Sequence, residues 1–197
     1  MNHRNRQRWL ILSHAFNMDG RASSQTITDK IPHLLAAGIE VVVLSGVSGV
    51  KDTRVEHHQL WPAGPAGVKF ELRHVLRRHV GHGATYRFWM MMASLLLLPG
   101  VLLEKLWRPV ESSWSWYATA YLKGLSLMRE KPFDLIYSTG GAFAAHLAGR
   151  ALKRRTGVPW LAEVHDPFIT PGKLASSAHE RMQLKVEQII CTEADSA

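Results

Sequence analysis

One short run, EVVVLSG at residues 40–46, constrains the fold more than any other part of the sequence. It is almost continuously apolar and β-branched, as expected for a strand that is buried on both faces. Strands of this kind belong to parallel sheets that helices cover on both sides. The preceding segments fit this arrangement, because we expect a strand at 9–16 and a helix at 25–38 that ends at Gly38.

The remaining sequence repeats this alternation of apolar runs and amphipathic segments. The expected strands cover 55–61, 134–140, 159–166 and 188–193, and the expected helices cover 68–80, 114–132, 142–157 and 176–187. This order predicts an α/β fold, a Rossmann-like parallel sheet with helices on both faces. The single cysteine, Cys191, falls in the last expected strand, where we expect it to be inert, and it excludes an internal disulfide.

The chain is basic, with a net charge of +8, and part of this charge is concentrated in one region. Arg73, Arg77, Arg78 and Arg87 fall close together and are interleaved with histidines. Such an excess favours an anionic partner, namely phosphates, nucleic acid or an acidic lipid surface, or else forms a solvated basic face. The sequence has no specific nucleic-acid motif, and the histidine spacings fit no zinc pattern, so we expect no metal.

The segment 85–107 is the most apolar part of the chain. From Phe88 to Leu103 it runs for sixteen residues without a charge, interrupted by Pro99 and Gly100. A spanning helix needs about 20 residues, which disfavours a transmembrane segment. Two interpretations remain, a core helix that ends at Pro99 and an exposed helix at the membrane interface. The second makes membrane-surface candidates of Arg77, Arg78, Arg87, Trp89, Leu95 and Leu96.

Three polar or glycine-rich corners follow expected strands, where doubly wound sheets bind their ligands. They contain Asp19, Gly20 and Arg21, then Gly140 and Gly141, and then His165 and Asp166. We expect all three to line one crevice, with His165 in reach of a substrate hydroxyl. Each corner also has a purely structural interpretation: a turn before a helix, close packing of helix on strand, and a histidine bonded to the backbone.

Four ordered segments resemble the amino-terminal domain of family 4 glycosyltransferases, which have the GT-B fold. They are FNMDGRASSQ, LLAAGIEVVVLSG, KPFDLIYSTGGAFAAHLAGRALKRRTGVPWLAEVHDPF and HERMQLKVEQIICTEADS. The resemblance covers most of the chain except about 50–85. It departs from the family pattern in the first loop, which has one glycine where two are common, and at Ile39, where a histidine is usual.

The resemblance implies transfer of a sugar from a nucleotide-sugar donor to a glycan or polyprenyl-linked acceptor, with retention and without a metal or other cofactor. Such enzymes have two Rossmann-like domains with the active site between them. Residues 1–197 would be the acceptor-side domain, without the donor-binding domain and inactive alone. His165 would contact the transferred sugar, and the loops at Asp19–Gly20 and Gly140–Gly141 would face donor phosphate or acceptor.

A basic segment followed by an apolar one suits a lipid-linked acceptor, as in polysaccharide biosynthesis. We therefore expect a cytoplasmic protein that is peripheral on the inner face of the cytoplasmic membrane. The basic amino terminus precedes too short an apolar run for a secretory signal, which agrees with this location. The alternatives are a non-catalytic Rossmann-like domain that docks on a membrane or on another subunit, and a fragment of a GT-B-like sugar-nucleotide epimerase.

Overall fold

The computed structural model describes residues 6–18, 20, 22–107, 112–140, 142–165, 168 and 176–197. Its parallel sheet has the strand order β3-β2-β1-β4-β5. The strands are β1 (Arg8–Leu12), β2 (Glu40–Ser45), β3 (Glu56–Gln59), β4 (Leu135–Thr139) and β5 (Trp160–Glu163). The helices are α1 (Ala22–Ala36), α2 (Pro65–Val80), α3 (Ala84–Trp107), α4 (Trp116–Glu130), α5 (Phe143–Thr156) and α6 (Ala178–Glu193).

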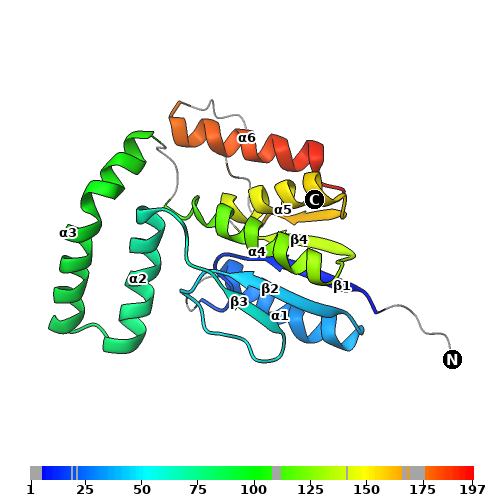
Figure 1. Cartoon of the computed structure of the whole chain (residues 1–197), viewed down its shortest axis with the longest axis horizontal. Coiled ribbons are helices and arrows are strands. Elements are labelled where there is room, and N and C mark those ends of the chain that lie inside the picture. Colours follow the sequence, from blue (N-terminus) through cyan, green and yellow to red (C-terminus); the bar gives the residue numbers. More distant parts are fainter. Residues whose placement is uncertain are drawn as a thin grey trace.

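Helices cover both faces of the sheet, which confirms the predicted fold class. Leu10 and Leu12 of β1 pack in one hydrophobic cluster with residues of α4, α5 and α6. Ile11, which points the opposite way, packs with Ile27 and Ile31 of α1. Because successive side chains of a strand point to opposite faces, the apolar runs fill both clusters at once. Figure 1 shows the resulting layers, with the sheet between α1 and the α4–α6 group.

The strand expected at 188–193 is wrong, because α6 continues without a break to Glu193. Val186, Ile189 and Ile190 are buried at helical spacing, so this short apolar run lies on the inner face of a helix. Cys191 therefore lies on α6 and is exposed instead of lying inside a strand. Beyond the helix, Ser196 pairs with Leu161 of β5 in an isolated parallel bridge, and Asp195 hydrogen-bonds to the backbone of Trp160.

Helix α3 is not the core helix that one interpretation of segment 85–107 predicted. It does not end at Pro99 but continues to Trp107, and Glu104 is the one buried residue among its 24 described residues. Gly100 lies against Pro65 in the first turn of α2, so packing supports the helix beside the missing amide of Pro99. Figure 1 shows α2 and α3 as a helical hairpin beside the sheet, with α3 on the outside.

Two buried glutamates attach this hairpin to the rest of the molecule. Glu71 of α2 is fully buried, and its Oε1 lies 2.9 Å from Nε2 of His14, which follows β1. The two groups form an ion pair when the imidazole is protonated, although no aligned hydrogen bond joins them. Glu104 of α3 accepts hydrogen bonds from the amide of Ala66 and the indole of Trp114. The first of these caps α2, whose own N-cap is a glycine.

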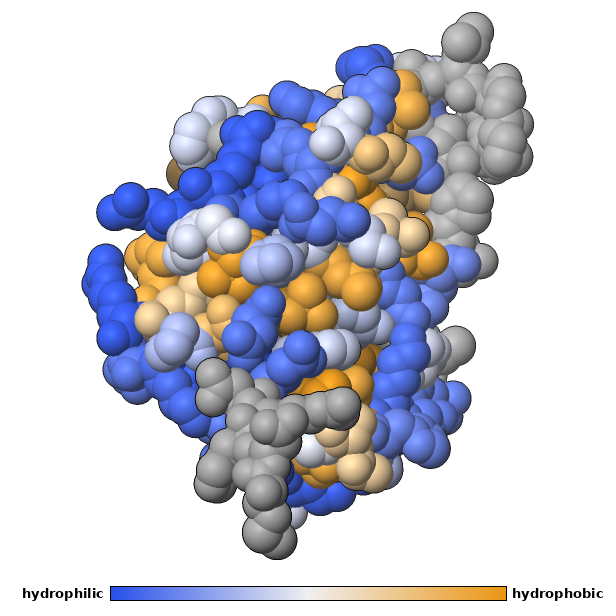
Figure 2. All heavy atoms as spheres, turned by 90° about the vertical axis from the view of Figure 1, so that its right-hand side faces the viewer, coloured by the Kyte–Doolittle hydropathy of each residue, from blue (hydrophilic) through white to orange (hydrophobic). Residues whose placement is uncertain are grey.

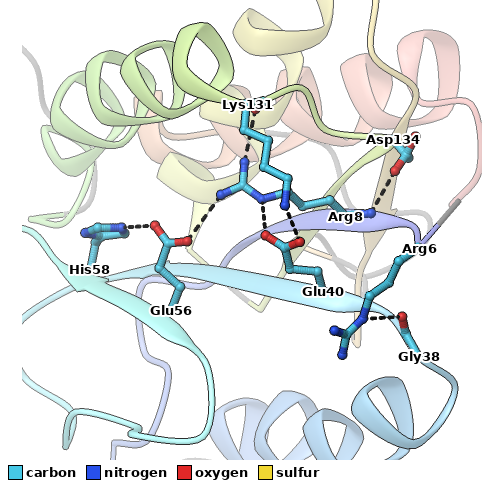
Figure 3. Close-up of polar contacts among 8 residues, drawn as sticks. All are labelled: Arg6, Arg8, Gly38, Glu40, Glu56, His58, Lys131 and Asp134. Carbon is cyan, nitrogen blue, oxygen red and sulfur yellow. Dashed lines mark hydrogen bonds and ion pairs between the residues drawn. The ribbon is translucent and has the colours of Figure 1, made fainter.

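Arg8, the first residue of the central strand β1, hydrogen-bonds to several neighbouring segments at the amino ends of the strands (Figure 3). Its guanidinium donates to Glu40 at 2.6 Å, to Glu56 at 3.2 Å and to the carbonyl of Lys131 at 3.0 Å, and its amide donates to Asp134 at 2.7 Å. Arg8 is only 6% exposed. Because Glu40 and Glu56 are the first residues of β2 and β3, one side chain fixes the starts of three strands.

Apolar surface is also present away from the hairpin. Figure 2 shows the side of the molecule opposite α2 and α3, where hydrophobic side chains form a band among hydrophilic ones. The hydrophobic cluster on the α1 face includes partly buried residues such as Leu34, Leu35 and Leu161. Of the described helices, α1 alone contributes to that cluster, so this face is covered less fully than the α4–α6 face.

Replacing the buried Arg8 with methionine should lower the free energy of unfolding by about 1.5 kcal/mol, the size typical of losing charge-assisted hydrogen bonds. Loss of the guanidinium would take away the shared partner of Glu40 and Glu56, although Glu40 keeps its contact with Lys131 and the exposed Glu56 keeps its contact with His58. Urea denaturation measures this change. The matched control is Arg6→Met, because Arg6 donates one exposed hydrogen bond to Gly38. This substitution should change the free energy of unfolding by no more than about 0.5 kcal/mol. Equal effects of the two substitutions would contradict a special role for Arg8.

Candidate active site

The switch point of the sheet lies between β1 and β4. These strands are neighbours, and the helices that follow them, α1 and α5, pack on opposite faces. Ligands of doubly wound sheets bind at this point, outside the carboxyl ends of the strands. Here the loop after β1 runs from residue 13 to residue 21, and Gly140 directly follows β4. The carboxyl edge around these two loops is therefore the candidate active site.

Position 140 requires a glycine because of its backbone conformation and not because of close packing. Its φ of 101° is one that side-chain-bearing residues rarely adopt, whereas a Cβ at this position would meet no atom within 4 Å. Its carbonyl accepts a hydrogen bond from Nε2 of His146, at 2.9 Å. The close-packing interpretation is thus wrong for this glycine, and the turn after β4 is held by a buried histidine.

His146 holds the turn as a neutral ring in a single tautomer. Trp160 Nε1 donates to Ser138 Oγ at 2.8 Å, and Ser138 Oγ in turn meets Nδ1 of His146 at 2.9 Å. Because Nε2 must donate to the carbonyl of Gly140, Nδ1 is the acceptor for the serine hydroxyl. Burial lowers the pKa of His146 to about 4, although the bond to Gly140 partly opposes this shift. The chain of hydrogen bonds therefore runs from β5 through β4 and α5 to the loop.

Glu163, at the end of β5, is the centre of a second network. Its carboxylate accepts hydrogen bonds from Lys30, Tyr137 and Thr139, the last at 2.8 Å. Burial alone would raise the pKa of Glu163, but these three donors together lower it below its ordinary value. Burial and the adjacent carboxylate raise the pKa of Tyr137, so this phenol remains a donor. An ionised carboxylate thus organises the carboxyl ends of β4 and β5.

His165 lies two residues beyond Glu163 and joins the same network. Its Nε2 is 3.3 Å from Oγ1 of Thr139, and its side chain is 25% exposed. The hydroxyl proton of Thr139 is donated to Glu163, so towards His165 the oxygen can only accept. The neutral ring of His165 therefore carries its proton on Nε2 and has Nδ1 as an acceptor. Such a nitrogen can accept a hydrogen bond from a substrate hydroxyl, the role predicted for this residue.

A buried histidine also holds the loop after β2. His57 Nδ1 accepts from the amide of Asp52 at 2.9 Å, and its Nε2 lies 2.8 Å from Ser45 Oγ, which donates to the carbonyl of Gly46. Burial lowers the pKa of His57 to about 4, against the opposing charge of Asp52. Near this loop lies a pocket of about 320 Å³. Its lining residues are Asn17, Met18, Ser48, Val50, His74, Arg77 and Arg78.

The sequence from residue 23 to residue 197 matches the family described as the glycosyl transferase 4-like domain. The chain belongs to this family. The predicted resemblance is therefore confirmed, and glycosyl transfer is the general activity that the family membership supports. No curated protein matches the chain.

Among solved structures, the chain is similar to sucrose-phosphate synthase from Thermosynechococcus elongatus, with a TM-score of 0.56 at 14% identity. At this identity the likeness concerns the fold alone, and it agrees with a Rossmann-like domain of the GT-B type. The match covers 96% of this chain and 41% of that enzyme. The chain thus spans less than half the length of the protein that it matches.

Several of the predicted site residues of this glycosyltransferase-type domain can be placed. Gly140 and His165 both lie beside Thr139, and Gly20 is an exposed turn residue with a φ of 73°. Four predicted positions lie outside the described residues, namely Asp19, Arg21, Gly141 and Asp166. Asn17 and Met18 of the first loop lie on the β2 side of β1, whereas β4 lies on its other side. The shared crevice stays a prediction.

The membrane-surface candidates divide into two groups. Trp89, Leu95 and Leu96 are 52%, 60% and 81% exposed on α3, as the interfacial interpretation requires. Arg78 instead donates to the carbonyls of Val47 and Gly49, and therefore faces the loop after β2. Arg77 donates from Nε to the ring of His82 and lines the pocket, and the exposed Arg87 lies in the first turn of α3. Among the described residues, α3 alone is long and apolar enough to cross a membrane.

Sequence reasoning missed the residues that organise the site, namely Lys30, Thr139, His146 and Glu163. A signal for Glu163 was present, because a carboxylate ends the otherwise apolar run WLAE. A second signal was the histidine among the alanines of FAAHLAG, the start of the helix after β4, although its partner is a backbone carbonyl. In the described part of the chain, no group of three metal-ligating side chains could hold a metal ion.

Acid should destabilise the fold through its two buried neutral histidines. His57 and His146 have pKa values of about 4, against about 6.5 in an unfolded chain. Between these values the unfolded chain binds protons that the folded chain does not, so the free energy of unfolding falls as the pH drops from about 6.5 to 4. In denaturant titrations at several pH values, His146→Gln should reduce this slope by up to about 1.4 kcal/mol per pH unit. A slope unchanged from that of the exposed-site control His33→Gln would contradict the assignment.

Proposed function

We propose that this chain is the acceptor-side domain of a glycosyltransferase that uses a nucleotide-sugar and acts on a membrane-borne glycan or lipid-linked acceptor, with retention of configuration. The observation that carries the proposal is the exposed apolar helix α3, which stands beside the edge that contains the candidate site in a glycosyl transferase 4-like domain. Membership of this family supports sugar transfer, and the position of α3 supports a lipid-associated acceptor.

The carboxyl edge offers groups that suit a sugar. The Thr139–His165 pair presents an imidazole that is oriented by the Glu163 carboxylate, and hydroxyl-rich ligands are recognised by such fixed acceptors and donors. Retaining transfer without a metal requires stabilisation of the departing diphosphate by fixed donors and positive charge. We propose that a second, nucleotide-sugar-binding domain faces this edge and supplies most of that stabilisation.

The surface of α3 favours contact with a bilayer. Its exposed side chains include large hydrophobic residues along the whole helix, among them Phe88, Met91, Leu103, Leu106 and Trp107. Contiguous apolar surface of this kind is rare on soluble monomers and marks an interaction site. Arg73 and Arg87, which do not line the pocket beside the loop after β2, make no ion pair with a carboxylate among the described residues. Uncompensated cations next to apolar side chains suit an anionic membrane surface.

Docking in the interface fits α3 better than crossing the bilayer. α3 packs against α2 through Gly100 and Glu104, so the two helices form one unit. α2 carries Lys69, Arg73 and Arg77, and a spanning α3 would take these charges to membrane depth, at a cost of several kcal/mol. A helix that lies in the interface keeps them at the level of the lipid headgroups.

Flotation with anionic vesicles tests the docking surface. The chain should float with vesicles that contain phosphatidylglycerol, and the double change Leu95→Gln and Leu96→Gln should weaken binding about tenfold or more, because apolar area is no longer withdrawn from water. The matched control is Leu122→Gln with Leu184→Gln, two exposed leucines on α4 and α6. If the control pair weakened binding equally, or if the chain never floated, the docking proposal would fail.

Turnover measurements test the sugar-handling site. In the enzyme that contains both domains, a mass-spectrometric screen of nucleotide-sugars should identify one that is consumed in the presence of membrane lipid. His165→Ala should then lower kcat about a hundredfold, the contribution typical of a positioned acid–base group. His33→Ala, an exposed histidine on α1, should leave kcat unchanged. Full activity of His165→Ala would remove His165 from the mechanism.

A further inference from the structure

The pocket of about 320 Å³ lies where three segments of the carboxyl edge meet. Asn17 comes from the loop after β1, Ser48 from the loop after β2, and His74, Arg77 and Arg78 from α2. The three α2 residues are spaced so that they share one face of that helix. The pocket therefore lies between the sheet loops and α2, and α3, the helix that we propose to dock on a membrane, is the outer helix of the same hairpin.

The walls of the pocket are held by specific contacts. A Cβ on Gly49 would lie 1.9 Å from the carbonyl oxygen of Phe16, so the loops after β1 and β2 are in direct contact. The amide of Val50 donates to the carbonyl of Asn17 at 3.0 Å, and Arg78 donates to the carbonyls of Val47 and Gly49 at 2.9 and 2.8 Å. A pocket whose loops are fixed in this way needs little ordering on binding a ligand.

The pocket is positively charged. Arg78 is bound by neutral carbonyls, so its charge is not compensated by a carboxylate. Arg77 uses Nε for the ring of His82, and within the described part of the chain the two terminal nitrogens of its guanidinium have no protein partner. None of the described lining residues is acidic. Arginine forks of this kind match the oxygens of phosphate groups.

A buried serine supplies a second, independent observation. Ser48 is 9% exposed, and its Oγ is buried without a hydrogen-bond partner in the described residues. Buried hydroxyls are normally paired, because an unpaired one costs free energy comparable to a lost hydrogen bond. Ser48 lines the same pocket as Arg77, and a rotation about its χ1 angle would turn its buried hydroxyl towards a ligand oxygen there.

We infer that this pocket binds the phosphoryl group of the acceptor, a phosphate monoester or diphosphate attached to a lipid in the membrane. This assignment rests on the proposed function and names the acceptor chemistry. Arg77 and Ser48 donate to the phosphoryl oxygens, while Arg78 holds the loop and adds its charge. The apolar part of the acceptor then runs from the pocket towards α3, and the sugar-receiving end points towards the switch point.

Two probes separate a lipid phosphate from a free one. Inorganic pyrophosphate, added to the chain in solution, should raise its Tm, because a ligand that binds only the folded state stabilises it. Vesicles that contain phosphatidic acid should bind the chain more tightly than vesicles of equal surface charge made with phosphatidylglycerol, because phosphatidic acid alone has a terminal phosphate monoester.

The pocket variant combines Ser48→Ala with Arg77→Gln, and the matched control combines Ser126→Ala with Arg129→Gln, both on α4, so both variants lose one charge and one hydroxyl. The pocket variant should lose the Tm shift and about tenfold of its affinity for phosphatidic acid, which removes the preference. The control should keep the Tm shift and the preference for phosphatidic acid. Equal losses in the two variants would overturn the inference.

The remaining outcomes are also decisive. A Tm shift without any preference for phosphatidic acid would assign the pocket to a soluble phosphate and overturn the lipid-linked acceptor. Binding to anionic vesicles that depends on Leu95 and Leu96 but shows neither the preference nor the shift would overturn this inference and leave membrane docking intact.

Discussion

The contact of Arg8 with the first residues of β2 and β3 is the constraint on which the rest of the structure depends. It sits on the central strand, in a register that pairs Arg8 with Glu40 and Val42 with Glu56. A slip of β2 by one residue would separate Glu40 from the guanidinium and turn its buried side chains to the wrong face. Because the strands are short, fixing where they start also fixes where they end. The contact of Arg8 at the amino ends of the strands therefore helps to determine where the candidate-site loops begin at their carboxyl ends.

At the carboxyl edge, different groups have different tasks. Neutral histidines hold the backbone, His146 at the turn after β4 and His57 at the loop after β2. An ionised carboxylate, Glu163, orients the side chains at the ends of β4 and β5. Glu71 and Glu104 attach the hairpin through α2 and α3. Arg77 and Arg78 of α2 make no ion pair with a described carboxylate, and both line the pocket beside the loop after β2.

The sequence correctly predicted the helices and strands whose positions depend on local residue patterns. The β-branched run of β2 and the helix 142–157, which ends at the left-handed Gly157, lie where they were expected. It misplaced the end of α6, because a short apolar run fits a strand and a buried helix face equally well. The exposure of α3 depends on whether another element covers it, which no local pattern contains. Likewise, Lys30 meets Glu163 across 133 residues of chain, a pairing that composition and spacing cannot show.

The indole of Trp160 couples four other positions, namely Ser138, Gly140, His146 and Gly149. Its Nε1 would lie 2.6 Å from a Cβ at position 149, which is glycine, and the same nitrogen begins the relay through Ser138 and His146 to Gly140. A substitution at any one of these positions should affect the others. A larger residue at 149, for example, would displace the indole ring and disturb the turn at Gly140 without contacting it. An engineer who wishes to graft a different loop after β4 would have to transplant these residues together.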